Sequence, residues 1–93
     1  MPTLRDLLSL PEQWSLVVTR PPADVAGWFA SSEGQFYPRA DFDRLAQKVF
    51  DLYASVNKEH AWTFRRHLDR RLDKRNRDRV AWTDTPDQAS PGR

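Results

Sequence analysis

The stretch DFDRLAQKVFDLYASV, residues 41–56, carries the strongest structural signal in the chain. Its large apolar residues recur at steps of three and four, which places them on one face of an α-helix with charged residues opposite. Asp41 precedes this face and has the side chain of a helix N-cap. The apolar residues are Phe42, Leu45, Val49, Phe50, Tyr53 and Val56. The stretch therefore predicts a helix with one buried face, around which a small core can form.

A second amphipathic stretch, KEHAWTFRRHLDRRL, follows at residues 58–72. Its inward positions at helical spacing are Ala61, Phe64, Leu68 and Leu72. We expect a break near Asn57, because Trp62 does not continue the apolar face of the preceding helix; one continuous helix is the alternative. Beyond these positions the inward face is taken by Arg75 and Arg79, so we expect the last turns to project beyond the body of the protein.

Short helical signals open the chain. Thr3 can cap a helix with Asp6 as its capping-box partner, and Ser9 with Glu12 repeats the same spacing. Residues 15–19 are rich in β-branched side chains. They form either a short strand or the end of the second helix, and periodicity cannot decide in so short an apolar run.

One more helix is predicted before residues 41–56. Pro22 stands where a helix can begin, Asp24 falls in the favourable first turn, and Gly34 is the expected stop. After the last amphipathic stretch, residues 83–93 (TDTPDQASPGR) contain no apolar side chain larger than alanine and predict a disordered tail.

The predicted fold is mainly α. We expect a small single-domain bundle of three or four helices over residues 1–82, with a basic C-terminal helix. A short strand near residues 15–19 stays open as an alternative to helix there.

Length and composition bound the class of protein. A chain of 93 residues fits one domain, and without cysteine it has no disulfide, no thiol nucleophile and no Cys-containing zinc site. No apolar run approaches the roughly 20 residues that a membrane helix needs. The opening sequence MPTLRDLLSL lacks the basic and apolar regions of a secretory signal. We expect a cytoplasmic protein with no membrane partner.

Positive charge is concentrated in residues 58–80, which hold nine basic and four acidic side chains. On a helix, four of the basic residues fall opposite the apolar face and form a stripe: Arg66, Arg70, Lys74 and Arg77. Arg65, Arg71 and Arg75 lie at its margins. Such a stripe can meet several phosphates of a nucleic acid, since the planar guanidinium of arginine bonds phosphate oxygens in pairs. A plain solvated helix face is the competing interpretation.

Two tryptophans do not fit the apolar faces. Trp62 lies away from the inward face of its helix, and Trp82 stands among polar residues just before the predicted tail. Each either clamps the core or contacts a partner by stacking or insertion.

Catalytic and metal-binding motifs are absent from the sequence. His60 and His67 are seven residues apart, about 10 Å along a helix, which is too far to share a metal ion. The three glycines form no phosphate-binding loop. We therefore expect no cofactor and a non-enzymatic binding module.

The first functional hypothesis is contact with nucleic acid or a nucleoprotein complex, through the basic stripe and its margins with Trp62. The alternative is a protein–protein adaptor, inhibitor or regulator, whose Arg-rich helix docks on an acidic protein surface. A homodimer formed through the helix at residues 42–56 is a third possibility.

Overall fold

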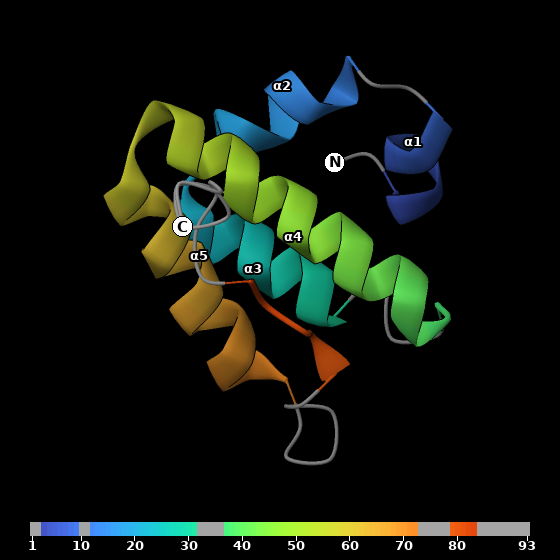
Figure 1. Cartoon of the computed structure of the whole chain (residues 1–93). Helices are drawn as coiled ribbons and strands as arrows, with labels where there is room; N and C mark the ends of the chain where they lie inside the picture. The colour runs from blue at the N-terminus through green and yellow to red at the C-terminus, as the bar shows by residue number, and fades with distance from the viewer. Residues whose placement is uncertain (1–2, 10–11, 32–36, 73–78, 84–93) are drawn as a thin grey trace, which may run out of the picture.

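Five helices follow one another in the part of the chain that the computed structural model describes, residues 3–9, 12–31, 37–72 and 79–83. They are α1 Leu4–Ser9, α2 Gln13–Val18, α3 Pro22–Ser31, α4 Arg39–Val56 and α5 Lys58–Arg71. These residues contain no strand, so the mainly α prediction is confirmed. In Figure 1, α4 crosses the front of the molecule with α1 and α2 above it, α3 behind it and α5 below.

The longest helix, α4, has the buried face that its periodicity predicts. All the predicted apolar residues except the last are fully or almost fully buried, whereas Val56 is 70% exposed at the end of the helix. The helix begins earlier than predicted, at Arg39 after Pro38, so Asp41 is not the N-cap. Asp41 lies in the first turn and accepts a hydrogen bond from Arg44 Nη2 at 2.8 Å. A carboxylate there still favours the positive end of the helix dipole.

The predicted break at Asn57 is confirmed. Asn57 is extended (φ −162°, ψ 114°), and its side-chain oxygen accepts a hydrogen bond from the backbone N–H of Glu59 at 2.9 Å. It therefore ends α4 and caps α5, and the two helices form an antiparallel hairpin. The four predicted inward residues of the second stretch are all buried.

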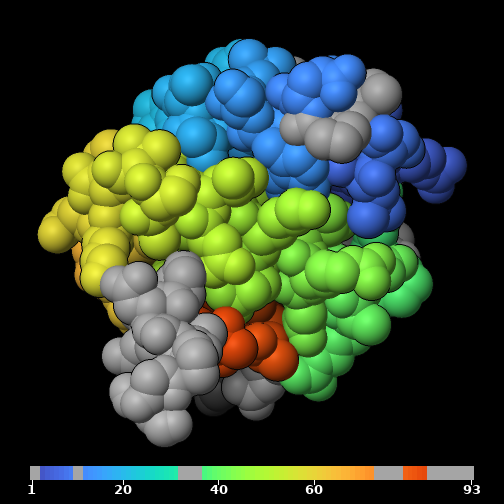
Figure 2. Space-filling view, turned by 45° about the horizontal axis from the view of Figure 1, so that its top comes forward, coloured from blue at the N-terminus to red at the C-terminus, as the bar shows by residue number. Residues whose placement is uncertain are grey.

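The prediction of a long projecting C-terminal helix is wrong. Helix α5 ends at Arg71, and Leu72 is extended (φ −72°, ψ 141°) yet only 4% exposed. Residues 79–83, here called the return segment, lie back on the body, as Figure 2 shows in orange-red beside α4. Val80 is buried, and Trp82 packs on the core. Burying these two side chains stabilises the folded chain, whereas a projecting helix would bury none of them.

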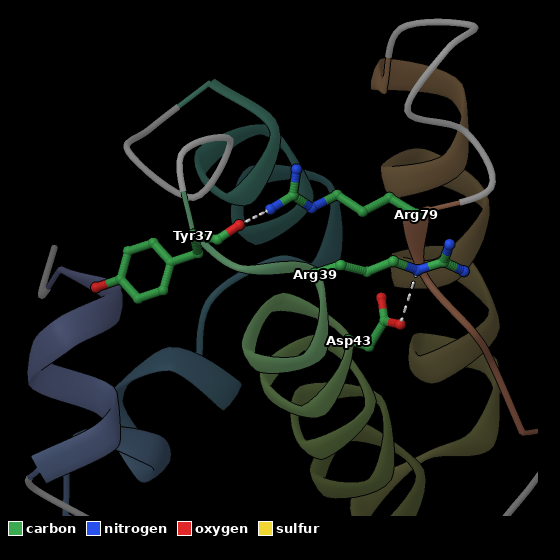
Figure 3. Close-up of polar contacts among 4 residues, drawn as sticks. All are labelled: Tyr37, Arg39, Asp43 and Arg79. Atoms are coloured by element: carbon green, nitrogen blue, oxygen red, sulfur yellow. Dashed lines mark hydrogen bonds and ion pairs between the residues drawn. The ribbon is translucent and has the colours of Figure 1, made fainter.

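The return segment is hydrogen-bonded to α4 and to Tyr37, which lies just before α4. Arg79 donates to the backbone carbonyl of Tyr37, and its guanidinium carbon lies 4.6 Å from the Phe42 ring centroid. Figure 3 shows Arg79 reaching across to Tyr37 beside the Arg39–Asp43 pair, which is 3.4 Å long. The N–H of Thr83 donates to Gln47 Oε1 at 2.9 Å. The first residue of the predicted tail is thus bonded to α4, and residues 84–93 lie outside the described part.

At the N-terminal end, α1 is capped as predicted. The Thr3 N–H donates to Asp6 at 3.2 Å, and the Asp6 N–H donates to the Thr3 hydroxyl at 3.1 Å. The second capping box does not form, because the Ser9 hydroxyl donates to the Arg5 carbonyl and Glu12 makes no side-chain cap bond.

The strand proposed near residues 15–19 is wrong, because α2 covers Gln13–Val18 and Thr19 is also helical in conformation. The helix buries Trp14 and Val17, three residues apart on one face. This tertiary burial outweighs the β preference of Val17 and Val18. The third helix begins at Pro22 as predicted, and the stop expected at Gly34 lies outside the described residues.

Aromatic rings hold the core between α3, α4 and α5. Phe29 on α3 lies 5.9 Å from Phe42 on α4 and 5.8 Å from Phe64 on α5, with edge-to-face geometry in both pairs. Such pairs add about 0.5–1.5 kcal/mol beyond the burial of their area. Tyr53 on α4 donates its hydroxyl to the Arg20 carbonyl at 2.7 Å, which fixes the end of α2 to the hairpin.

Candidate interaction surface on α5

The sides of α5 face different neighbours. At about 100° per residue, Trp62, Arg65 and Asp69 fall toward α4 and the return segment. Arg71 falls toward α3, whereas Arg66 and Arg70 point to solvent. Contacts agree with this assignment, because Trp62 touches Phe50 on α4 and Arg71 lies over α3. We call Arg65, Arg66, Arg70 and Arg71 the α5 basic surface.

Arg66 and Arg70 form the centre of this surface. Both are exposed, and they are four residues apart, which is about 6 Å along the helix. Within the described residues, neither makes an ion pair or a hydrogen bond to a carboxylate. Their guanidinium groups are therefore open to an anionic partner.

Arg65 is held between two indole rings. Its guanidinium carbon lies 5.1 Å from the Trp62 ring centroid and 5.4 Å from the Trp82 ring centroid. Trp62 is itself packed edge-to-face on Phe50, with centroids 5.4 Å apart. We call Trp62, Arg65 and Trp82 the Trp–Arg–Trp stack. Both tryptophans are half-buried and pack against the core. Their outer parts orient the Arg65 side chain at the surface.

Asp69 is engaged by the return segment. One of its carboxylate oxygens accepts a hydrogen bond of 3.0 Å from Trp82 Nε1. Asp69 is the acidic residue nearest in sequence to Arg65, Arg66 and Arg70, and its observed partner is the indole. The Asp69 carboxylate thus helps to fix Trp82 against α5.

Arg71 lies across α3 at a glycine. A Cβ atom placed on Gly27 would be 3.4 Å from Arg71 Cζ, so the guanidinium rests directly over the backbone of α3. Arg71 therefore packs against α3 at Gly27, at one edge of the α5 basic surface.

Part of the predicted site lies outside the described residues. The structure places Arg65, Arg66, Arg70 and Arg71 on α5 together with Trp62. Lys74, Arg75 and Arg77 fall in residues 73–78, which are not described. Since α5 ends at Arg71, the stripe does not continue on this helix. Trp82 also belongs to the site, because it contacts Arg65. In the sequence it stood out as one large aromatic residue among polar neighbours.

The described residues contain no group of three His, Cys, Asp or Glu side chains that could hold a metal ion. His60 is engaged with the Tyr53 ring, with centroids 6.3 Å apart. None of the helices in the described ranges is both long and apolar enough to pass through a membrane.

Comparison of the chain with protein-family models, with curated proteins and with solved structures finds no match.

Proposed function

We propose that this protein is a non-enzymatic binding module that contacts the phosphate backbone of nucleic acid through the α5 basic surface. One observation carries the proposal. Arg66 and Arg70 stand side by side on the solvent face of α5, exposed, and no carboxylate within the described residues pairs with them. Arginine is suited to this role because its fork of N–H donors matches phosphate oxygens.

The local charge supports a polyanionic partner. Between Arg65 and Arg71 the helix carries four arginines and one acidic residue, Asp69, which is bonded to Trp82. Glu59 is the other acidic residue of α5, and it lies about 16 Å from Arg70 along the axis. Two of the arginines occupy the last turn, where they also stabilise the negative end of the helix dipole. A nucleic acid offers phosphates at a spacing that several of these side chains can meet together.

The Trp–Arg–Trp stack favours a second candidate, an acidic protein surface. Tryptophan and arginine are the residue types that most often dominate protein–protein binding energy, and here they are adjacent and half-exposed. The homodimer hypothesis has less support, because the apolar face of α4 that it relied on is buried within the chain.

The proposal is tested by measuring the binding of fluorescein-labelled nucleic acids by fluorescence anisotropy, from roughly 50 to 200 mM salt. The three probes are single-stranded RNA, single-stranded DNA and duplex DNA. The test variant is Arg66→Glu/Arg70→Glu. Its matched control is Arg5→Glu/Arg20→Glu, which changes the charge equally at two exposed arginines outside α5. We expect the test variant to lose at least about tenfold in affinity and the control to lose much less.

Single Arg66→Ala and Arg70→Ala substitutions should each lower the slope of log affinity against log salt by about one. Thermal unfolding of every variant checks that the fold is kept. Equal losses in the test and control variants would show that only net charge matters and that α5 is not the contact. Absence of binding to all three nucleic acids at the lowest salt would reject the proposal and favour the acidic protein partner.

A further inference from the structure

A small hollow lies on the other side of α4 from α5, where α1 and α2 meet α4. Its floor consists of the buried side chains of Leu7, Trp14 and Leu45. Its rim consists of Leu8, which is 45% exposed, with Arg44 and Lys48. Figure 2 shows the boundary between the blue helices α1 and α2 and the green α4, where these elements meet. The hollow therefore has an apolar floor and a partly cationic rim.

The size of the hollow limits what can occupy it. Its volume is about 110 Å³, whereas pockets for small molecules and cofactors usually have roughly 300–1,000 Å³. An apolar cavity of roughly 150 Å³ accepts benzene. The hollow thus fits one branched aliphatic side chain, such as leucine or isoleucine, and excludes a nucleotide or a cofactor.

The charges at the rim select the partner that supplies this side chain. Arg44 and Lys48 are one helical turn apart, and no acidic residue among those described lines the hollow. Arg44 gives one N–H to Asp41, which leaves further donors of its guanidinium to other acceptors. Lys48 Nζ lies 5.3 Å from the Trp14 ring centroid and holds its charge over the floor. An aliphatic side chain flanked by carboxylates one turn apart would satisfy both the floor and the rim.

We propose that this hollow docks a leucine or isoleucine from an acidic amphipathic helix of a partner protein, whose carboxylates pair with Arg44 and Lys48. The interaction uses the helix-in-groove mode of peptide recognition, with a single anchor. The exposure of Leu8 supports the docking, because a partner helix would cover this side chain. The proposed nucleic-acid contact lies on α5, across α4 from the hollow, so the two surfaces can be occupied together (Figure 1).

The probe is a short helical Glu–Ala peptide that carries one leucine with glutamates one turn apart beside it. Two further peptides replace the leucine by alanine or the glutamates by lysines. Binding is followed in ¹H–¹⁵N correlation spectra through the indole N–H of Trp14 and the amides of residues 44–48. We expect saturable shifts of these signals with the first peptide, and binding at least about tenfold weaker with either of the others.

Protein variants test whether the peptide binds in the hollow or on α5. Lys48→Glu and Leu8→Gln change exposed rim residues, so each should keep the fold. Each should lower the affinity for the first peptide by about tenfold. Arg66→Glu/Arg70→Glu should leave its affinity unchanged. Equal binding of the leucine and alanine peptides, or loss of binding in the α5 variant, would overturn the proposal. Shifts of the same signals with protein concentration alone would also overturn it, because they would assign the hollow to a second copy.

Discussion

Trp82 Nε1 donates a hydrogen bond of 3.0 Å to Asp69 Oδ1, and this bond joins the return segment to α5. The same indole packs on Phe50 from α4 and Phe64 from α5, with centroid distances of 5.5 and 6.1 Å. Trp82 therefore touches both helices of the hairpin.

Substitutions at this contact should separate ring packing from the hydrogen bond. Trp82→Ala removes both and should lower the free energy of unfolding by about 2–4 kcal/mol, since the side chain is partly buried. Asp69→Ala removes only the acceptor and should cost about 1 kcal/mol. Urea denaturation measures both. A cost below about 0.5 kcal/mol for Trp82→Ala would mean that docking of the Trp82 side chain adds little to stability.

Phe50 should be among the most sensitive positions of the core. It is fully buried on α4 and contacts the rings of Trp62 and Trp82. Phe50→Ala should cost about 3–5 kcal/mol, which can unfold so small a domain. Val56→Ala on the same helix is the control, because Val56 is 70% exposed and should change stability by less than about 0.5 kcal/mol. Circular dichroism during urea denaturation distinguishes the two variants, and similar stability in both would contradict this assignment of the core.

Stability should fall at alkaline pH through Tyr53. Burial, and secondarily the nearby carboxylate of Asp24, raise the pKa of Tyr53 well above its ordinary value. A folded-state pKa above the unfolded one gives stability that is complete below the unfolded pKa, about 10, and is lost as the pH rises further. Urea denaturation from about pH 8 to 11 should show this decline.

Tyr53→Phe is the control for this pH dependence. The variant loses the hydrogen bond to the Arg20 carbonyl, so it should be less stable at neutral pH by about 1 kcal/mol. Its stability should nevertheless fall less steeply above pH 10 than that of the parent. Identical slopes in the two proteins would assign the alkaline decline to other groups.

Gly27 should accept alanine with a gain in stability. It lies inside α3, where glycine is less favourable than alanine by about 0.5–1 kcal/mol. The added Cβ would meet only the end of the Arg71 side chain, at 3.4 Å, and this flexible group can move. A rise of the thermal midpoint in Gly27→Ala is the expected result. A fall would show that Arg71 is held firmly over α3.

Periodicity was enough to predict the two helices that form the hairpin at the centre of the fold. The inward residues of both amphipathic stretches are buried, apart from Val56, because spacing at three and four residues determines which side chains share a helix face. The break near Asn57 could also be predicted, since Trp62 does not continue the apolar face of the preceding helix. The structure adds that the Asn57 side chain caps α5. The secondary structure of residues 15–19 could not be predicted in this way, because so short an apolar run fits a helix and a strand equally well.

The end of α5 and the Trp–Arg–Trp stack could not be read from local sequence. Leu72, Lys74 and Arg75 are good helix formers, and neither glycine nor proline occurs between Arg71 and Val80, so no strong helix breaker marks the stop. The chain turns back because Val80 and Trp82 find an apolar surface made by other helices. For the candidate site, the helical spacing predicted that Arg66 and Arg70 are exposed. The position of Arg65 depends on Trp82, seventeen residues away, and no periodic pattern reports such a contact.

The return segment also constrains the order in which the chain can assemble. Phe50 and Phe64 come from different helices, so the surface that receives Trp82 exists only after α4 and α5 have paired. Pairing of α4 and α5 needs only a tight turn at Asn57, and contacts that are local in sequence form fast. Complete docking of Trp82 therefore requires that pairing. An intermediate that contains the hairpin without the docked segment would leave both Arg65 and the aromatic surface beneath Trp82 uncovered.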